Sequence, residues 1–90
     1  MTPLKQPPIP NPLIFYGAPW CSDCIRAKSL LDEKKVHYDY VNIDENTDAA
    51  KQVIKINGGN RSIPTIIFPN GKILTEPSNQ ELSDELTNLT

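Results

Sequence analysis

The segment Leu13–Lys28 reads LIFYGAPWCSDCIRAK, and the organisation of the remaining sequence follows from it. Its first four residues are apolar, and Gly17-Ala18-Pro19 separates them from Cys21 and Cys24, the two cysteines of the chain. A short apolar run favours a buried central strand, and the proline-containing stretch favours a turn into a helix. The order strand, turn, cysteine pair and helix predicts a redox site where the helix begins.

The helix expected from about Cys21 to Lys35 gives the two cysteines different roles. The first turn of a helix has unpaired N–H groups and a positive dipole end, and both stabilise a thiolate, which is the form that attacks a disulfide. Cys21 lies at that position, so we expect it to be the nucleophile. Cys24 follows three residues later on the same face, within reach of a disulfide, so we expect it to be the resolving thiol.

Two other interpretations of the cysteine pair are weaker. A structural disulfide would close a loop of only four residues, which the chain-entropy account values at about 2 kcal/mol, against ~3 for fifteen residues. A zinc site has at most three ligands in one chain, because His37 is the only histidine and is expected on the surface of another strand. We therefore expect no metal, although a metal shared between two chains stays open.

Length and composition indicate one ordinary globular domain. The chain has 90 residues and a net charge of −2, which gives no electrostatic reason to expect nucleic acid or an anionic membrane as partner. No apolar run approaches the ~20 residues that span a bilayer. Residues 1–12 contain five of the nine prolines and are expected to form an extended lead-in to a domain over 13–90. Without an export signal we expect a cytoplasmic location, where cysteine pairs react more often than they crosslink.

The rest of the chain predicts five further elements of an α/β fold. Its order, β-α-β-α-β-β-α, combines a right-handed parallel crossover with an antiparallel hairpin at Pro69-Asn70-Gly71, in one four-stranded mixed sheet flanked by helices. Ser78 and Glu81 form a capping-box pattern before the last helix. The expected segments are a strand at 36–44, a helix at 47–57, strands at 65–68 and 72–75, and a last helix with Leu82, Leu86 and Leu89 buried. Cys24, Ala27 and Leu31 form the buried face of the first helix, and Arg26 lies on its outer face.

The chain resembles the glutaredoxin family of the thioredoxin fold over nearly all of Leu13–Leu89. The resemblance rests on Trp20-Cys21-x-x-Cys24, on Arg26-Ala27-Lys28 and on Arg61-Ser62-Ile63-Pro64-Thr65. Residues 60–65 and 74–78 are similar to the mycoredoxin subgroup. The resemblance implies that Pro64 is a cis-proline beside Cys21 and that the backbone of Ile63 pairs with a bound thiol or peptide. The sequence alone does not decide between the cis and trans forms of Ile63–Pro64.

The chain departs from the usual glutathione-binding pattern at two places. No basic residue shortly precedes Cys21, and no Gly-Gly-acidic sequence precedes the last helix. Arg61 and Lys51 are candidate partners of a thiol's carboxylate, although Lys51 is expected to be an ordinary solvated charge. The backbone at Ser78 and Asn79 begins a helix and is a further candidate. The expected thiol-binding set is Trp20, Arg61, Ile63, Pro64, Ser78 and Asn79.

These observations predict a thiol–disulfide oxidoreductase that acts on protein disulfides or on mixed disulfides with a small thiol. The resemblance implies glutathione or mycothiol as co-substrate, no tightly bound cofactor, a monomer, and electrons from the small thiol or from a flavin-dependent reductase such as thioredoxin reductase. An alternative with the same chemistry is an electron donor to a reductase, itself reduced by thioredoxin reductase. Two other classes also stay open. One is an iron–sulfur carrier that holds a [2Fe–2S] cluster between two subunits through Cys21 and a bound thiol. The other is a binding module of the same fold without redox turnover.

Overall fold

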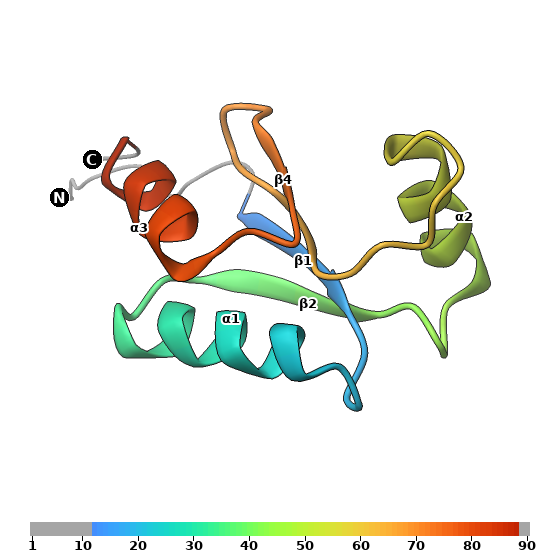
Figure 1. Cartoon of the computed structure of the whole chain (residues 1–90), viewed down its shortest axis with the longest axis horizontal. Helices are drawn as coiled ribbons and strands as arrows, with labels where there is room; N and C mark the ends of the chain where they lie inside the picture. The colour runs from blue at the N-terminus through green and yellow to red at the C-terminus, as the bar shows by residue number, and fades with distance from the viewer. Residues whose placement is uncertain (1–11, 89–90) are drawn as a thin grey trace, which may run out of the picture.

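The computed structural model describes residues 12–88, so most of the proline-rich lead-in and the predicted contact of Leu89 lie outside the described residues. The sheet has the strand order β2-β1-β3-β4. β1 is parallel to β2 and antiparallel to β3, and β3 is antiparallel to β4. The predicted four-stranded mixed sheet is therefore confirmed (Figure 1). The elements are β1 (Leu13–Gly17), α1 (Ser22–Glu33), β2 (Tyr38–Asn42), α2 (Thr47–Ile56), β3 (Thr65–Ile67), β4 (Ile73–Thr75) and α3 (Asn79–Asn88).

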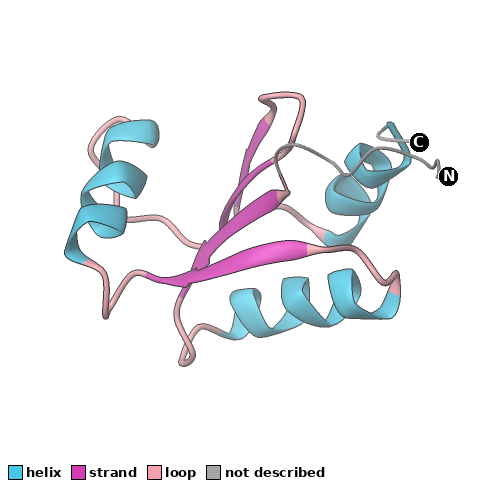
Figure 2. Cartoon of the chain, turned by 180° about the vertical axis from the view of Figure 1, so that it is seen from behind, coloured by secondary structure: helices cyan, strands magenta, loops and turns pink. Residues whose placement is uncertain are grey.

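The three helices are distributed unevenly around the sheet. α1 and α3 contact each other, whereas α2 lies at the other end of the molecule from α3 in both views (Figures 1 and 2). The loops that precede α1, α2 and β3 contact one another, since Asp44 before α2 binds both Trp20 before α1 and Arg61 before β3. Among residues 12–88, no helix is long and apolar enough to cross a membrane.

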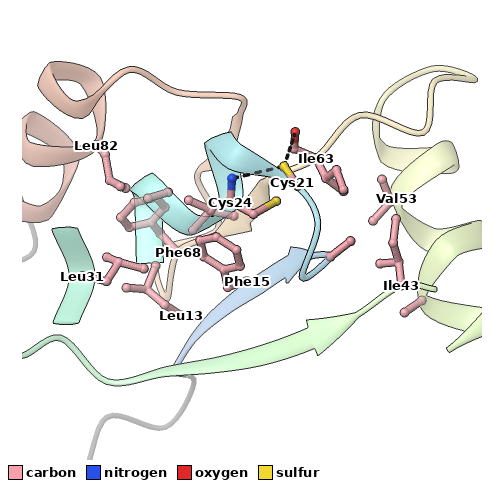
Figure 3. Packing of buried hydrophobic residues seen from close by; sticks show 14 of the residues in the cluster. Leu13, Phe15, Cys21, Cys24, Leu31, Ile43, Val53, Ile63, Phe68 and Leu82 are labelled. Carbon is pink, nitrogen blue, oxygen red and sulfur yellow. Dashed lines mark hydrogen bonds between the residues drawn. The ribbon is translucent and has the colours of Figure 1, made fainter. Parts of the chain in front are cut away.

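β1 is central because its alternate side chains fill the core. Leu13 and Phe15 are buried, whereas Ile14 and Tyr16 are only partly covered. Figure 3 shows Leu13 and Phe15 beside Leu31 of α1, together with Phe68, which follows β3, and Leu82 of α3. Burial of such side chains stabilises the fold by about 1.5–3 kcal/mol each. The core fixes the strand end from which the cysteine motif begins.

The first helix and the second strand are shorter than predicted. Local hydrogen bonds of backbone N–H groups stop the helix at its C-terminal end and limit the strand at both ends. α1 ends at Glu33 instead of Lys35, and Lys35 adopts a left-handed conformation with φ of 58°. The N–H of Val36 donates to the Leu31 carbonyl over 2.9 Å, so β2 begins only at Tyr38. At the other end, the N–H of Asp44 donates to the side chain of Asn42 over 2.9 Å, and β2 stops there instead of continuing through Asp44.

The predicted second helix is confirmed to within one residue. Asn46 caps α2, since its side chain accepts the N–H of Ala49 at 3.0 Å. The helix ends at Ile56, and Gly59 donates its N–H to the Ile54 carbonyl over 2.8 Å. Gly58, at φ of 67°, supplies the left-handed conformation that favours glycine after a helix.

The predicted hairpin and final cap are also present. Each strand is one residue shorter than predicted, since β3 ends at Ile67 and β4 begins at Ile73. The N–H of Phe68 donates to the Lys72 carbonyl over 2.8 Å and closes the turn between them. Before α3, the Ser78 N–H donates to Glu81 Oε1 over 2.8 Å and the Glu81 N–H donates to Ser78 Oγ over 3.1 Å. This reciprocal pair is the capping box that the sequence indicated.

Arg26 is placed differently from the prediction. Its guanidinium is only partly exposed and donates to Asn79 Oδ1 at 2.6 Å and to the Pro77 carbonyl at 2.9 Å. It also lies 3.7 Å from Asp23 one turn earlier. Helical periodicity assigned Arg26 to the solvent face of α1, but the long side chain reaches across to the start of α3 and joins the two helices.

Candidate active site

Cys21 is the N-cap residue of α1, and its side chain takes the place of a capping oxygen. Its backbone is extended, with φ of −83° and ψ of 113°, and its sulfur accepts the Cys24 N–H at 3.1 Å. The Cys21 carbonyl accepts the N–H of Ile25 at 3.0 Å. The sulfur therefore faces an N–H donor and the positive end of the helix, an arrangement that stabilises a thiolate.

The loop before β3 forms the other wall of this site. The Ile63–Pro64 peptide bond is cis, as the family resemblance implied. The Ile63 carbonyl oxygen lies 4.0 Å from the Cys21 sulfur, and Figure 3 shows the sulfur between that oxygen and the Cys24 nitrogen. The Pro64 carbonyl accepts the N–H of Glu76 at 2.8 Å, which anchors the loop to the segment before α3.

The two thiols differ in exposure, and burial changes the pKa of the second. Both are free, and Cys21 is 8 % exposed whereas Cys24 is 0 % exposed. Burial, together with a hydrogen bond to Cys21, raises the pKa of the Cys24 thiol to about 12. Cys24 therefore holds its proton at neutral pH, beside a sulfur that is capped by an N–H group. This asymmetry is the one that an attacking and a resolving thiol require.

Gly17 makes room for the buried thiol. A Cβ atom at Gly17 would lie 2.9 Å from Cys24 Sγ and 2.9 Å from a ring carbon of Phe15. Since real side chains do not approach so closely, the end of β1 must lack a side chain where α1 crosses it. The sequence shows this glycine directly before the motif, but nothing in a linear pattern reveals which atom it faces.

Asp44 is a residue of the site that sequence reasoning missed. Its Oδ2 accepts the Trp20 indole N–H at 2.5 Å and its Oδ1 accepts the Arg61 guanidinium at 2.7 Å. These two bonds hold the pKa of Asp44 below its ordinary value. The available signal was its place after a strand parallel to β1, because the carboxyl ends of parallel strands meet at one edge.

Two of the predicted thiol-binding residues, Ser78 and Asn79, form hydrogen bonds with other side chains of the protein. Ser78 is engaged in the cap with Glu81, which holds the pKa of that carboxyl below its ordinary value. Asn79 accepts a hydrogen bond from Arg26. Both therefore form the junction between α1 and α3. Of the other predicted residues, Ile63 and Pro64 lie on the loop whose Ile63 carbonyl is 4.0 Å from the Cys21 sulfur, and Trp20 and Arg61 are both bound to Asp44. Lys51 and His37 are exposed, as expected.

A cleft of about 410 Å³ lies next to the cysteine motif. The Nζ atom of Lys28 lies 4.0 Å from the centre of the Tyr40 ring inside it. Burial is the main cause that raises the pKa of Tyr40. Trp20 is 64 % exposed and Ile25 54 % exposed beside the same motif, so the surface around the cysteines offers both apolar and polar contacts. The cleft is lined by Ala18, Pro19, Ile25, Lys28, Tyr40, Asn42 and Glu45. Within the described part of the chain, no three His, Cys, Asp or Glu side chains gather as metal ligands.

Several known proteins are similar to this chain in sequence. The family model Glutaredoxin matches residues 13–74. A Mycobacterium tuberculosis protein provisionally named as a glutaredoxin is 40 % identical over 77 residues, which are 86 % of this chain and 92 % of the relative. Mycoredoxin 1 of Corynebacterium glutamicum is 32 % identical over 63 residues, 70 % of this chain and 77 % of that protein.

Solved structures agree on the fold. A glutaredoxin from Archaeoglobus fulgidus superposes with a TM-score of 0.74 at 21 % identity, covering 86 % of this chain and 87 % of that one. A buckwheat glutaredoxin, solved as a glutathione complex, gives a TM-score of 0.65 at 21 % identity, covering 87 % and 70 %. The arrangement of sheet and helices is thus the thioredoxin-like one that the sequence predicted.

Proposed function

The chain belongs to the glutaredoxin family of thiol–disulfide oxidoreductases, and we propose that it reduces mixed disulfides and protein disulfides through Cys21. In this proposal Cys21 is the nucleophile and Cys24 the resolving thiol. One observation carries it, namely that the Cys21 sulfur accepts the Cys24 N–H at 3.1 Å while the Cys24 thiol is buried. The first sulfur is thereby prepared for ionisation and the second is kept protonated.

The reaction requires two exchanges at the Cys21 sulfur. The Cys21 thiolate attacks one sulfur of the substrate disulfide, the old S–S bond breaks, and the leaving sulfur takes up a proton as a thiol. Either Cys24 gives up its proton and attacks Cys21, closing the Cys21–Cys24 disulfide and releasing the second thiol, or a small thiol attacks the mixed disulfide directly. In the first route, two small thiols return two electrons and two protons to the protein and become a disulfide.

The small thiol that we propose is mycothiol in preference to glutathione. Similarity to a mycoredoxin supports this choice, as does the absence of a basic residue in Tyr16–Pro19 before Cys21. Trp20, Ile63, Pro64 and Arg61 would form the thiol-binding wall, with the Ile63 backbone pairing with the bound thiol. Ser78 and Asn79 would act there only by shaping the start of α3.

A monomer in the cytoplasm is sufficient for this chemistry. One chain supplies both cysteines and the Ile63 backbone, and a reducing compartment keeps both thiols free for exchange. The disulfide form of the small thiol would be returned to the thiol by an NADPH-dependent flavoprotein reductase.

Turnover coupled to NADPH tests the proposal. A disulfide substrate is offered with mycothiol and its reductase, with glutathione and its reductase, or with thioredoxin reductase alone. We expect the mycothiol system to give the highest kcat/KM, Cys21→Ser to abolish turnover, and Cys24→Ser to retain it with a small thiol. Turnover only with thioredoxin reductase and only with Cys24 present would contradict the small-thiol route. A normally folded Cys21→Ser variant of unchanged activity would contradict the redox role altogether.

A further inference from the structure

The carboxylate of Asp44 connects two walls of the thiol site. Trp20 precedes the nucleophile in the loop before α1, and Arg61 lies two residues before Ile63 in the loop before β3. Each oxygen of Asp44 has a different partner, the Trp20 indole at 2.5 Å and the Arg61 guanidinium at 2.7 Å. Its own backbone is fixed, since its N–H donates to Asn42 Oδ1 at 2.9 Å. The side chain is therefore held between the two loops.

This arrangement changes what Arg61 offers to a ligand. The Arg61 and Asp44 side chains are 42 % and 37 % exposed, so an incoming carboxylate has access to the guanidinium but meets a carboxylate already bound to it. Asp44 is attached to the chain and has a short side chain, so it loses less freedom in this contact than a free ligand would. Glu45 adds a second negative charge next to it. A ligand carboxylate is consequently at a disadvantage.

The second contact of Asp44 affects the apolar side of the site. Hydrogen bonding to Asp44 fixes the Trp20 indole while 64 % of its surface stays exposed beside Cys21. An ordered indole face provides contact area for uncharged parts of a ligand at little entropic cost. The two contacts act in the same direction, since one weakens recognition of anions and the other supports recognition of uncharged groups.

We propose that Asp44 is a specificity-determining positioning residue, which occupies Arg61 and orients Trp20 so that the site takes an uncharged thiol in preference to one that carries carboxylates. The inference deepens the proposed function and rests on it for the identity of the thiol. Glutathione carries two carboxylates, whereas the cysteine of mycothiol is acetylated and joined to sugars by an amide, without a carboxylate. Asp44 would therefore contribute to discrimination between these two thiols.

Binding of an unreactive glutathione derivative tests this without turnover. The probes are S-methylglutathione and its diethyl ester, which share a skeleton and differ in their carboxylates. Their Kd values are measured by fluorescence of Trp20, the single tryptophan of the chain, and by calorimetry. Releasing Arg61 in Asp44→Asn should tighten the free acid about three- to fivefold, the upper part of the range of an exposed ion pair, and leave the ester within twofold.

Three further variants separate the contact from other causes. Asp44→Glu keeps the charge and should keep the preference of the parent protein. Glu45→Gln removes one neighbouring negative charge but leaves the contact between Asp44 and Arg61 in place, so it should tighten the free acid less than Asp44→Asn does. Arg61→Gln combined with Asp44→Asn should cancel the gain for the free acid. Thermal unfolding midpoints of all variants serve as the control for folding.

The outcomes are distinct from those of the activity assay. Equal effects of Asp44→Asn and Glu45→Gln on the ratio of acid to ester, or no effect of Asp44→Asn, would overturn the role of Asp44. A larger shift in that ratio for Asp44→Asn than for Glu45→Gln supports it, whether or not the protein turns over a small thiol. Failure of the proposed function would instead appear as absence of turnover with every thiol, while the binding preference persists.

Discussion

The main-chain N–H of Cys24 donates to the sulfur of Cys21 over 3.1 Å, while the side chain of Cys24 is fully buried. One turn of α1 therefore places an N–H donor on the first sulfur, while the core shields the second sulfur from solvent. The positions follow from helix geometry, since residues three apart lie on one face. The difference in burial follows from β1, which packs against Cys24 but leaves Cys21 at its end.

This asymmetry predicts selective alkylation. Iodoacetamide reacts with thiolates, and a thiol with a pKa of about 12 is ionised to only about one part in 10⁵ at pH 7. We expect the reduced protein to take up one equivalent at pH 7, on Cys21, as measured by mass spectrometry of its peptides. In guanidinium chloride, both cysteines should react. Equal modification of the two in the folded protein would contradict the assigned asymmetry.

Gly17→Ala should destabilise the protein because the added methyl group would clash with the Cys24 sulfur. The new Cβ would lie 2.9 Å from Cys24 Sγ, and overpacking of this kind costs about 1–3 kcal/mol. Urea unfolding measures the loss. The matched background is Cys24→Ala, in which the sulfur is absent and the loss should be smaller, although the Phe15 contact remains. Identical losses in the two backgrounds would show that the close approach of Gly17 and Cys24 is not the cause.

Asn57→Ala should lower the free energy of unfolding, because the Asn57 side chain joins the end of α2 to β3 and β4. The side chain of Asn57 donates to Thr65 Oγ1 at 3.0 Å and to the Val53 carbonyl at 2.9 Å, and it accepts the Thr75 hydroxyl at 2.7 Å. Thr65 is fully buried, so the loss should be about 1–3 kcal/mol. Asn60→Ala is the control, because its exposed bond spans 3.4 Å and its removal should cost under about 0.5 kcal/mol. Similar losses for both would contradict a special role for Asn57.

Tyr38 should make stability fall at alkaline pH. Burial, together with the hydrogen bond of its hydroxyl to Asp32 at 2.7 Å, raises its pKa from 10.0 to about 12. Because the folded value exceeds the unfolded one, this contribution is complete below pH 10 and declines as the pH rises toward 12. Urea unfolding at pH 8 to 11.5 should show a decline that is smaller in Tyr38→Phe. An unchanged decline would assign it to other groups.

The sequence by itself determined the features that depend on short-range chemistry. Leu13–Gly17 is a strand because it is a short apolar run, Cys21 begins a helix because a turn precedes it, and Ser78 with Glu81 caps another. Such features involve residues a few positions apart, so periodicity, caps and turn residues are sufficient to predict them. The predicted ends of α1 at Lys35 and of β2 at Asp44 are wrong, because a single hydrogen bond of a backbone N–H group determines where such an element stops.

Only the tertiary structure decided which distant groups meet around Cys21. It placed the Ile63 carbonyl 4.0 Å from the Cys21 sulfur, directed Arg26 to α3, and joined Trp20 to Arg61 through Asp44. These contacts depend on strand order and on the reach of long side chains, neither of which leaves a periodic signal in the chain. The cysteine motif is therefore encoded locally, whereas the proposed discrimination between thiols depends on contacts made where three loops converge.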